Sequence, residues 1–314
     1  MKNITLSAIT IALICETIIS VVTGFIPPPS LFQKEIIRHD SSITALTAFT
    51  PFHDIHQTNA HHSLPKISAH RGASRVAPEN TLAAFTKAIE MGADFIEIDV
   101  RTTSDGKQVC MHDASLKRTT GLNEKVINVT FQKIKELSAG ISFGTEFAQE
   151  KVPSLSEVCQ LVRRMNKSQS NNVKLYLDCK DITEEEVLTV LNQYQLLDSA
   201  IFYGDVNTLK AIRKISPLAR LMPPYPGPQH IDEVIAALQP VAFDVAWINV
   251  DSSLVTDCHK RGIKVFSDLL DEHDVSLQYS KAIRLGIDLI QTDDVSSVKR
   301  SISEYEKKLR NEKH

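Results

Sequence analysis

The chain of 314 residues has little of what would mark several common classes of protein. A formal net charge of -3, with no cluster of lysines and arginines among aromatic residues, gives no reason to expect a nucleic acid partner. No glycine-rich loop follows the first expected strand, which disfavours an open nucleotide-binding sheet. The five cysteines show no paired metal-ligand spacing, so free buried thiols are expected rather than disulfides. The cysteines expected in strands and helices are Cys110, Cys159, Cys179 and Cys258.

The N-terminal sequence has no uncharged run long enough to cross a bilayer by itself. An uncharged stretch over residues 3–15 is interrupted by Glu16 before the apolar sequence resumes and ends near Ile26. A bilayer span needs about 20 apolar residues, and an acid at its centre costs about 3 kcal/mol. We therefore predict that residues 1–26 form a signal peptide, which implies export to the periplasm, the cell envelope or the medium. A retained membrane anchor over residues 4–26 is the alternative.

The segments that flank the central sequence have a different composition. Residues 27–65 are rich in Pro, Ser, Thr and His and follow no helical or strand period, which is typical of a flexible linker. Residues 301–314 mix basic and acidic side chains, and we predict a solvated C-terminal tail with a terminal helix.

Residues 66–300 alternate between strand-like and helix-like segments. This alternation predicts a parallel sheet, and about eight units over about 250 residues favour a closed TIM (β/α)8 barrel over an open doubly wound sheet. The helix expected over Asn80–Met91 has an apolar stripe, with Asn80 as N-cap and Gly92 at its end. The later segments are helices near 184–194, 206–215, 230–238, 253–261 and 275–285, and strands near 200–203, 220–222, 241–248, 264–267 and 287–292.

Two carboxylates lie on one face of the strand expected over Phe95–Val100. Because side chains alternate along a strand, Glu97 and Asp99 share one face and the apolar residues share the other. Two acids this close raise one another's pKa unless a cation or a buried donor lies between them. Oxygen-only ligands favour Ca²⁺ or Mg²⁺ over metals that prefer thiolates, so the strand predicts a divalent cation site.

Two histidines, His70 and His112, each end an apolar segment. An Asp-Gly turn within residues 103–106 predicts a chain reversal that returns His112 to the level of Asp99. Imidazole titrates near neutrality, so one histidine can take a proton from a nucleophile while the other gives a proton to a leaving alkoxide. Arg71 adds a planar fork of donors suited to phosphate oxygens.

A further acid, Asp178, lies in the strand-like segment Val173–Lys180. Tyr176, Asp178 and Lys180 share one face of that segment. Asp178 is therefore a candidate third metal ligand, and Lys180 is a candidate for neutralising phosphate charge. An ordinary strand with a charged end is the alternative for this segment taken alone.

The order of these motifs and the residues within them resemble those of the glycerophosphodiester phosphodiesterase family. The family signature reads His-Arg-Gly, Pro-Glu-Asn-Thr, Glu-x-Asp and His-Asp, and all four motifs occur here in that order. Residues 113–121 and 152–157 resemble the start and the end of a small insertion in that family, and residues 285–294 resemble its closing strand. The resemblance covers about residues 66–297. The four signature motifs begin at His70, Pro78, Glu97 and His112.

This resemblance implies a TIM barrel that hydrolyses glycerophosphodiesters to sn-glycerol 3-phosphate and an alcohol with the help of Ca²⁺ or Mg²⁺. The insertion, residues 114–153, would lie over the barrel mouth and help to choose the substrate, with Phe143 as a candidate lining residue. Asn80 would be only a helix cap. The implied site consists of His70 and His112 as acid and base, Glu97, Asp99 and Asp178 as metal ligands, Arg71 and Lys180 as phosphate-binding residues, and Glu79 as a supporting residue at the edge of the site.

Two positions depart from the family pattern. The family commonly has glutamate where Asp178 stands, so the third ligand reaches about one methylene less far. The family commonly has an aromatic Trp-Thr-x-Asn stretch where this chain reads Val265-Phe-Ser-Asp-Leu269, so the alcohol or glycerol pocket is expected to differ. Two other functions stay open at this point. One is an enzyme of the same scaffold that acts on lysophospholipid or sphingolipid head groups, and the other is a non-catalytic phosphoester-binding barrel.

Overall fold

The computed structural model describes residues 63–169 and 172–312. The predicted signal peptide or anchor over residues 1–26, and the predicted linker up to residue 62, lie outside the described residues. Within the part of the chain that is described, no helix combines the length and the apolar character that a membrane crossing requires.

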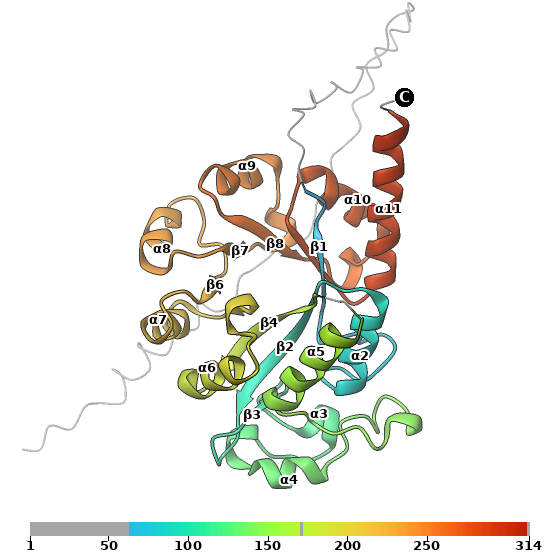
Figure 1. Ribbon diagram of the computed structural model, residues 1–314, viewed down its shortest axis with the longest axis vertical. Coiled ribbons are helices and arrows are strands. Elements are labelled where there is room, and N and C mark those ends of the chain that lie inside the picture. The colour runs from blue at the N-terminus through green and yellow to red at the C-terminus, as the bar shows by residue number, and fades with distance from the viewer. Residues whose placement is uncertain (1–62, 170–171, 313–314) are drawn as a thin grey trace, which may run out of the picture. The chain divides into compact units, whose positions relative to one another are not determined.

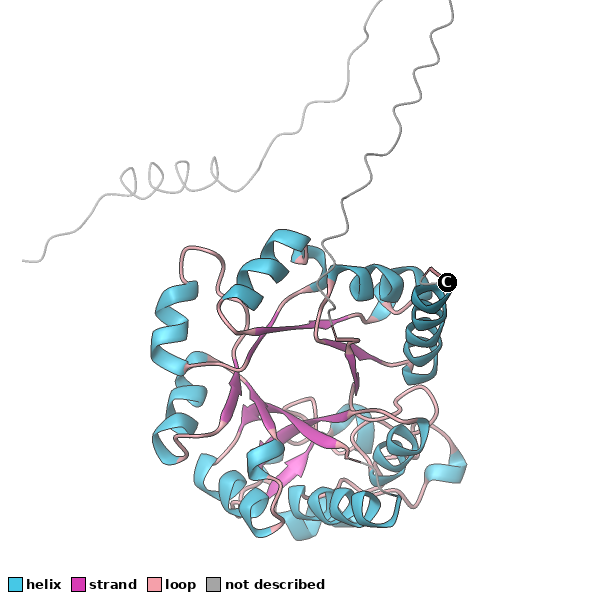
Figure 2. Ribbon diagram, turned by 45° about the horizontal axis from the view of Figure 1, so that its top comes forward, coloured by secondary structure: helices cyan, strands magenta, loops and turns pink. Residues whose placement is uncertain are grey.

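Eight parallel strands form a closed ring with helices outside it, as Figure 2 shows. The hydrogen-bonded order is β6-β5-β4-β2-β1-β9-β8-β7. A parallel bridge between Pro224 and Asp244 joins the two end strands of this order and closes the ring. The predicted (β/α)8 barrel is confirmed. The strands are β1 (Lys66–Ala69), β2 (Phe95–Thr102), β3 (Gln108–Cys110), β4 (Lys174–Asp181), β5 (Ile201–Tyr203), β6 (Arg220–Met222), β7 (Ala242–Asp244), β8 (Lys264–Asp268) and β9 (Leu289–Thr292).

The helices follow the strands in alternation and cover the outer face of the ring (Figure 1). The predicted boundary between barrel and tail at residue 300 falls inside the last helix. Ile302 and Tyr305 on that helix still pack against the core, although the surrounding sequence is charged. The helices are α2 (Leu82–Met91), α3 (Lys117–Thr120), α4 (Phe131–Glu136), α5 (Leu155–Gln169), α6 (Glu184–Gln193), α7 (Val206–Ile215), α8 (Ile231–Leu238), α9 (Ser252–Lys260), α10 (Ser276–Leu285) and α11 (Val295–Asn311).

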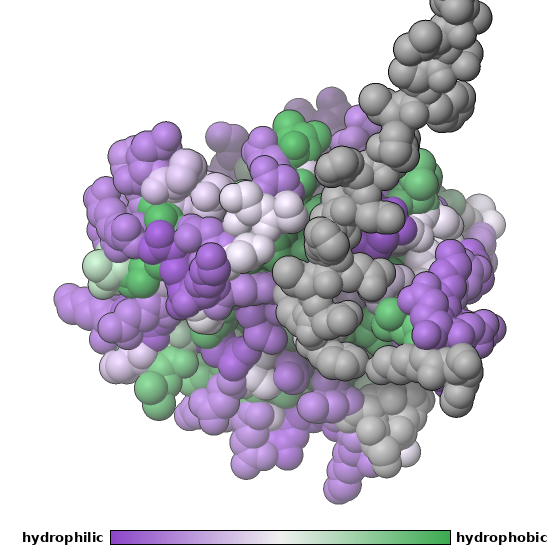
Figure 3. Space-filling model, turned by 90° about the horizontal axis from the view of Figure 1, so that it is seen from above, coloured by the Kyte–Doolittle hydropathy of each residue, from purple (hydrophilic) through white to green (hydrophobic). Residues whose placement is uncertain are grey.

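Buried apolar side chains form three separate clusters. The largest lies between the strands and the outer helices, and a smaller one, which includes Phe95 and Phe266, fills the inside of the barrel. The four described cysteines are buried and free, as predicted. On the face shown in Figure 3, hydrophilic side chains prevail on the described surface and hydrophobic ones are scattered among them. The apolar residues are thus largely used in packing, as expected for a barrel core.

The insertion has the third cluster as its own core. The predicted turn at residues 103–106 is present, with the Gly106 amide donating to the Thr103 carbonyl at 3.0 Å, and it leads into β3. β1 pairs with β2 only at Phe95 and Ile96, whereas β3 pairs antiparallel with the last three residues of β2. The helices α3 and α4 then pack over buried residues that include Val126 and Ile134.

The strand predicted over residues 241–248 is shorter than expected. β7 ends at Asp244, and residues Trp247–Asn249 form a short 3₁₀ turn in which the Asn249 amide donates to the Ala246 carbonyl at 2.8 Å. Ile248, which continued the apolar run, is 80% exposed. The barrel wall needs only three residues from this segment, and the remaining apolar residues form a connection.

Candidate active site

A cavity of about 550 Å³ opens where the barrel strands end. In a (β/α)8 barrel the carboxyl ends of the strands gather at one face, so residues distant in sequence meet there. Seven of the eight residues predicted to form the site line this cavity, and Lys180 does not. The predicted residues that line it are His70, Arg71, Glu79, Glu97, Asp99, His112 and Asp178.

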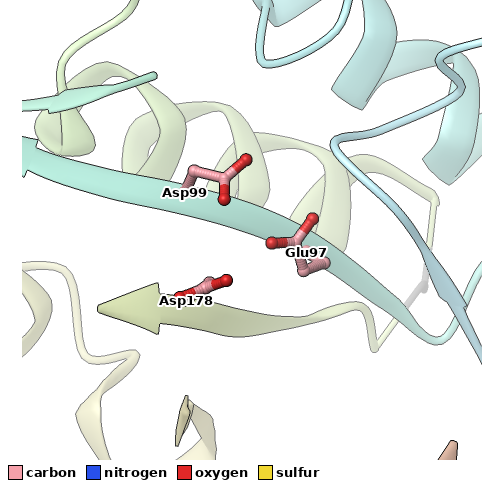
Figure 4. A group of neighbouring side chains, drawn as sticks. All are labelled: Glu97, Asp99 and Asp178. Carbon is pink, nitrogen blue, oxygen red and sulfur yellow. The ribbon is translucent and has the colours of Figure 1, made fainter. Parts of the chain in front are cut away.

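Three carboxylates meet at the centre of the site. Glu97 and Asp99 extend from β2 and Asp178 from the adjacent β4, and all three point toward one another (Figure 4). Each can offer one oxygen within 4.8 Å of the others. Burial, together with the neighbouring Asp99 and Asp178, raises the pKa of Glu97 well above its usual range. These residues fit a hard divalent cation, which would take oxygen ligands and offset the repulsion. The acidic triad could therefore hold a metal ion.

Lys180 lies beside the triad rather than along the cavity. Its Nζ is 2.5 Å from Oδ2 of Asp178 and 3.3 Å from Oδ1 of Asp99. Burial alone would lower the pKa of Lys180, but the two carboxylates outweigh it and raise that pKa. The structure thus places Lys180 in contact with two predicted metal ligands, and its charge offsets part of theirs.

His70 is held by an aspartate that follows the last strand. The Nδ1 atom of His70 is 2.9 Å from Oδ1 of Asp293, and the Ser74 hydroxyl donates to the same oxygen at 2.8 Å. Burial would raise the pKa of Asp293, but the hydrogen bonds and charge of its neighbours outweigh this effect and lower it. No hydrogen bond within the described residues involves the second ring nitrogen of His70, and the side chain lines the cavity.

The turn after His70 explains the glycine in its motif. Arg71 and Gly72 both adopt the left-handed backbone region, with φ of 54° and 83°. A Cβ atom at Gly72 would lie 2.7 Å from the backbone carbon of Ala84, closer than such atoms can approach. This turn aims the Arg71 amide at Glu97, to which it donates at 2.7 Å. The motif therefore fixes His70 beside the acidic triad.

His112 is held by a chain of ion pairs that reaches into the insertion. Its Nδ1 atom is 2.8 Å from Oδ1 of Asp113, and Arg118 in α3 contacts both oxygens of Asp113 at 2.8 and 3.0 Å. Arg118 also donates to both oxygens of Glu79 at 2.7 and 2.8 Å. Glu79 in turn accepts from Arg71 at 3.2 Å. One network therefore connects the second histidine to the arginine that follows the first.

The Nε donor of the Arg71 guanidinium is buried and forms no hydrogen bond with a described residue. This atom is 3.4 Å from Oδ2 of Asp99, and it is the buried side-chain nitrogen or oxygen within the described residues that lacks a hydrogen-bond partner. A buried donor without a partner costs free energy until an acceptor binds. The side chain lines the cavity, so a phosphate oxygen is a suitable acceptor.

The interpretation of Asn80 as a helix cap is wrong. The N-cap of α2 is Thr81, whose hydroxyl accepts from the Ala84 amide. The amide of Asn80 instead donates to Oδ2 of Asp99 at 2.8 Å, and its oxygen accepts from the Asp99 backbone at 3.2 Å. Asn80 has φ of 55°, a conformation that asparagine tolerates better than most residues. It therefore holds a carboxylate of the triad in place.

The insertion does not line the cavity as predicted. No residue of 114–153 contacts it, and Phe143 packs edge to face on Phe147, with ring centroids 5.4 Å apart, while staying 43% exposed. The contact of the insertion with the site runs through Arg118, which lies in the motif of residues 113–121 but was not predicted to be a site residue.

Another part of the cavity carries aromatic rings and acids. Tyr176 of β4, Tyr203 of β5 and Asp268 of β8 line it, and Tyr203 donates its hydroxyl to Asp244 of β7. Burial raises the pKa of Asp268 to about 6. Burial, followed by Asp268 and Asp178, raises the pKa of Asp244 well above its usual range. Asp268 lies in the segment 265–269, where the sequence departed from the family pattern.

Comparison with known proteins agrees with this geometry. The model of the glycerophosphoryl diester phosphodiesterase family matches residues 70–297. This chain belongs to that family. It is 33% identical over 235 residues to the glycerophosphodiester phosphodiesterase of Caldanaerobacter subterraneus subsp. tengcongensis, a match that covers 73% of this chain and 93% of the relative. The prediction of an enzyme of this family is confirmed.

Solved structures of the family share the barrel. A glycerophosphodiester phosphodiesterase from Agrobacterium tumefaciens superposes with a TM-score of 0.69 at 24% identity, covering 76% of this chain and all of the relative. A phosphodiesterase from Oleispira antarctica, solved with the product sn-glycerol-3-phosphate, superposes with a TM-score of 0.69 at 26% identity. This match covers 76% of this chain and 97% of the relative. The family fold therefore extends over the whole described barrel.

Proposed function

We propose that this chain hydrolyses glycerophosphodiesters to sn-glycerol 3-phosphate and an alcohol, with Ca²⁺ or Mg²⁺ as cofactor. The observation that carries the proposal is the cavity in which two imidazoles, a buried arginine donor and three convergent carboxylates meet. The product found with the Oleispira antarctica relative supports the same substrate class.

Each site residue has a separate task in this proposal. Glu97, Asp99 and Asp178 hold the cation, which when bound supplies Lewis acid polarisation of the phosphate. Arg71 binds a phosphate oxygen through its free Nε donor, and Glu79 keeps the guanidinium in place. Lys180 lowers the net negative charge that an anionic substrate meets near the triad.

The two histidines move the protons. One takes a proton from the nucleophile and the other gives one to the leaving alkoxide, each through the ring nitrogen that its aspartate does not contact. The nucleophile is either water or the neighbouring glycerol hydroxyl of the substrate itself. Analysis of products made in labelled water distinguishes these routes, because the second passes through a cyclic phosphate.

The proposed function is tested by release of glycerol phosphate from glycerophosphodiesters by the purified protein. We expect release with added Ca²⁺ or Mg²⁺ and its loss with chelator, followed by recovery when the ion is restored. A parallel assay on a lysophospholipid tests the other substrate class. Turnover of the lysolipid without turnover of the glycerophosphodiester would contradict the proposal, as would full activity in excess chelator.

We also propose that the protein is exported, since residues 1–26 have the composition of a signal peptide. Fractionation of cells, with sequencing of the mature N-terminus, tests this. A cleaved N-terminus outside the cytoplasm is the expected result, whereas an intact N-terminus in the membrane fraction would favour the anchor.

A further inference from the structure

One buried carboxylate near the site has no role in the proposed reaction. Asp274 lies in the loop between β8 and α10, and its side chain is fully buried. Its Oδ1 atom accepts from the hydroxyl of Tyr279, at 2.6 Å, and from that of Thr292. Its Oδ2 atom accepts from the Asp293 backbone amide at 3.2 Å and from Nη2 of Arg75 at 2.6 Å. A buried charge is costly unless it is paired and hydrogen-bonded, and here both oxygens have partners.

Two of the donors to Asp274 belong to the loops that carry His70 and its aspartate. His70 and Arg75 lie in the loop between β1 and α2, and Asp293 follows β9. The backbone amide that donates to Asp274 is that of the same aspartate whose side chain contacts the His70 ring. Beside Arg75, the Ser74 hydroxyl donates to that side chain at 2.8 Å. One carboxylate therefore ties the loop of the histidine to the backbone of its partner.

Arg75 is held from two sides at the edge of the cavity. Its Nη1 atom is 3.2 Å from Oδ2 of Asp294, the N-cap of α11, while its Nη2 atom contacts Asp274. The Arg75 side chain lines the cavity and is 47% exposed. Burial raises the pKa of Asp293, and its hydrogen bond with His70 and the charge of Arg75 are among the effects that outweigh burial. Arg75 therefore helps to keep ionised the carboxylate that contacts the His70 ring.

We propose that Asp274 and Arg75 are positioning residues for His70. An ionised carboxylate only accepts, so Asp293 holds the proton on Nδ1 of the ring and leaves Nε2 to exchange a proton in the cavity. Asp274 and Arg75 fix Asp293 for this task and transfer no proton themselves. This inference rests on the proposed function, in which His70 acts as acid or base. The orientation of one imidazole, and not only the stability of the barrel, is thus expected to depend on these contacts.

The test compares the purified wild-type protein with Asp274→Asn and Arg75→Met. Asparagine has one acceptor oxygen in its side chain, so its amide nitrogen meets donors to which it cannot bond. We expect Asp274→Asn to lower kcat by about 10- to 100-fold, as loss of a group that orients a histidine commonly does, with little change in KM. Arg75→Met should lower kcat by about tenfold, and Arg75→Lys should recover part of that loss, because an ammonium can still pair with one of the two acids.

Nitrogen-15 NMR of the histidine rings separates positioning from stability. The His70 signal, assigned with a His70→Gln variant, should show a neutral ring that carries its proton on Nδ1 in the wild-type protein. In Asp274→Asn and Arg75→Met we expect a mixture of the two tautomers. An unchanged His70 spectrum in both folded variants would overturn the proposal, and so would a kcat equal to that of the wild type.

The matched control for the buried acid is Asp288→Asn. Asp288 precedes β9 with a side chain that is 15% exposed. It accepts from the Val265 amide at 2.9 Å and contacts Nε2 of His259 at 2.8 Å, and it does not line the cavity. We expect Asp288→Asn to lower the midpoint of urea unfolding while leaving kcat and the His70 tautomer unchanged. An equal loss of kcat in Asp274→Asn and Asp288→Asn would overturn the proposal, because general destabilisation would then explain it.

The matched control for the arginine is Arg261→Met. Arg261 forms ion pairs with Asp232 of α8 and Asp257 of α9, and it does not line the cavity. This variant removes the same charge and two ion pairs, and its kcat should equal that of the wild type. Arg75 is half exposed, so its variants keep the test decisive if Asp274→Asn does not fold.

Failure of the proposed function is recognised separately. If the wild-type protein hydrolyses none of the glycerophosphodiesters, the histidine spectra still decide the inference. Loss of the Nδ1 tautomer of His70 in Asp274→Asn, with that tautomer kept in Asp288→Asn, supports the positioning role. The same His70 spectrum in the wild type and both variants contradicts it.

Discussion

The two histidines of the site have the same partner chemistry but are supported by different parts of the molecule. His70 follows β1 and contacts Asp293 after β9, so both residues of the pair belong to the barrel. His112 follows β3 and contacts Asp113, which depends on Arg118 of the insertion. The His70 side chain is 17% exposed and that of His112 is 36% exposed. One of the two proposed acid-base residues is therefore held by the barrel alone, and the other depends on contacts from a small subdomain.

The largest effect should come from removing either imidazole. His70→Ala and His112→Ala should each lower kcat by about 10² to 10⁴, the usual contribution of a general acid or base. Binding of glycerol 3-phosphate should change little, because the acidic triad and Arg71 remain. Undiminished turnover in either variant would end the assignment of that histidine as acid or base. Steady-state kinetics at several pH values measures this.

The next largest loss of activity should come from replacing the aspartates that contact the two imidazole rings. Asp293→Asn and Asp113→Asn should each lower kcat by about 10- to 100-fold, as loss of a group that orients a histidine commonly does. We expect the larger loss for Asp293→Asn, because Ser74 and the barrel hold residue 293 in place and an amide there would orient the His70 ring less well. The pH profile should also shift, whereas a purely structural defect would lower the rate at every pH.

The barrel could be predicted from sequence because its alternation of strands and helices is regular. The acidic triad and both histidines were predictable because residues that end neighbouring strands must meet at one face. Asp293 also ends a strand, and that position was the available signal for it. Arg118, in contrast, acts across 39 residues to reach Glu79, a distance that no local period reports. Asp268 was not predicted as a site residue because residues 265–269 depart from the Trp-Thr-x-Asn pattern of the family.

The stability of the insertion can be lowered by a substitution that lies outside the site. Ile134 is fully buried in the insertion cluster, and Ile134→Ala should destabilise that cluster by about 2 to 5 kcal/mol. Hydrogen exchange should then show local opening of residues around α3 and α4 and a lower kcat. Ile212→Ala, on the buried face of α7 in the outer core, is the control. Equal loss of protection throughout the barrel in both variants would show that the insertion has no stability of its own.

The smallest effect should come from Arg118→Ala. Arg118 is the main reason that the pKa of Asp113 lies below its usual range, with burial opposing it. A carboxylate with a lowered pKa adds stability above its unfolded pKa of about 3.9, and this contribution is lost as the pH falls through the folded pKa. The wild type should therefore exceed the variant in unfolding free energy at pH 7, and the gap should narrow toward pH 3. A gap independent of pH in urea titrations would contradict this origin.

The pairing of β3 sets a rule for exchanging the insertion between relatives. β3 occupies the edge of β2 that the short β1 leaves unpaired. The strand that leads into the insertion therefore shares one hydrogen-bond ladder with the strand bearing Glu97 and Asp99. A slip of one residue along that ladder would turn every side chain of β3 to the other face. A foreign loop joined after His112 should keep the imidazole in place, while a junction inside residues 103–110 should misplace it.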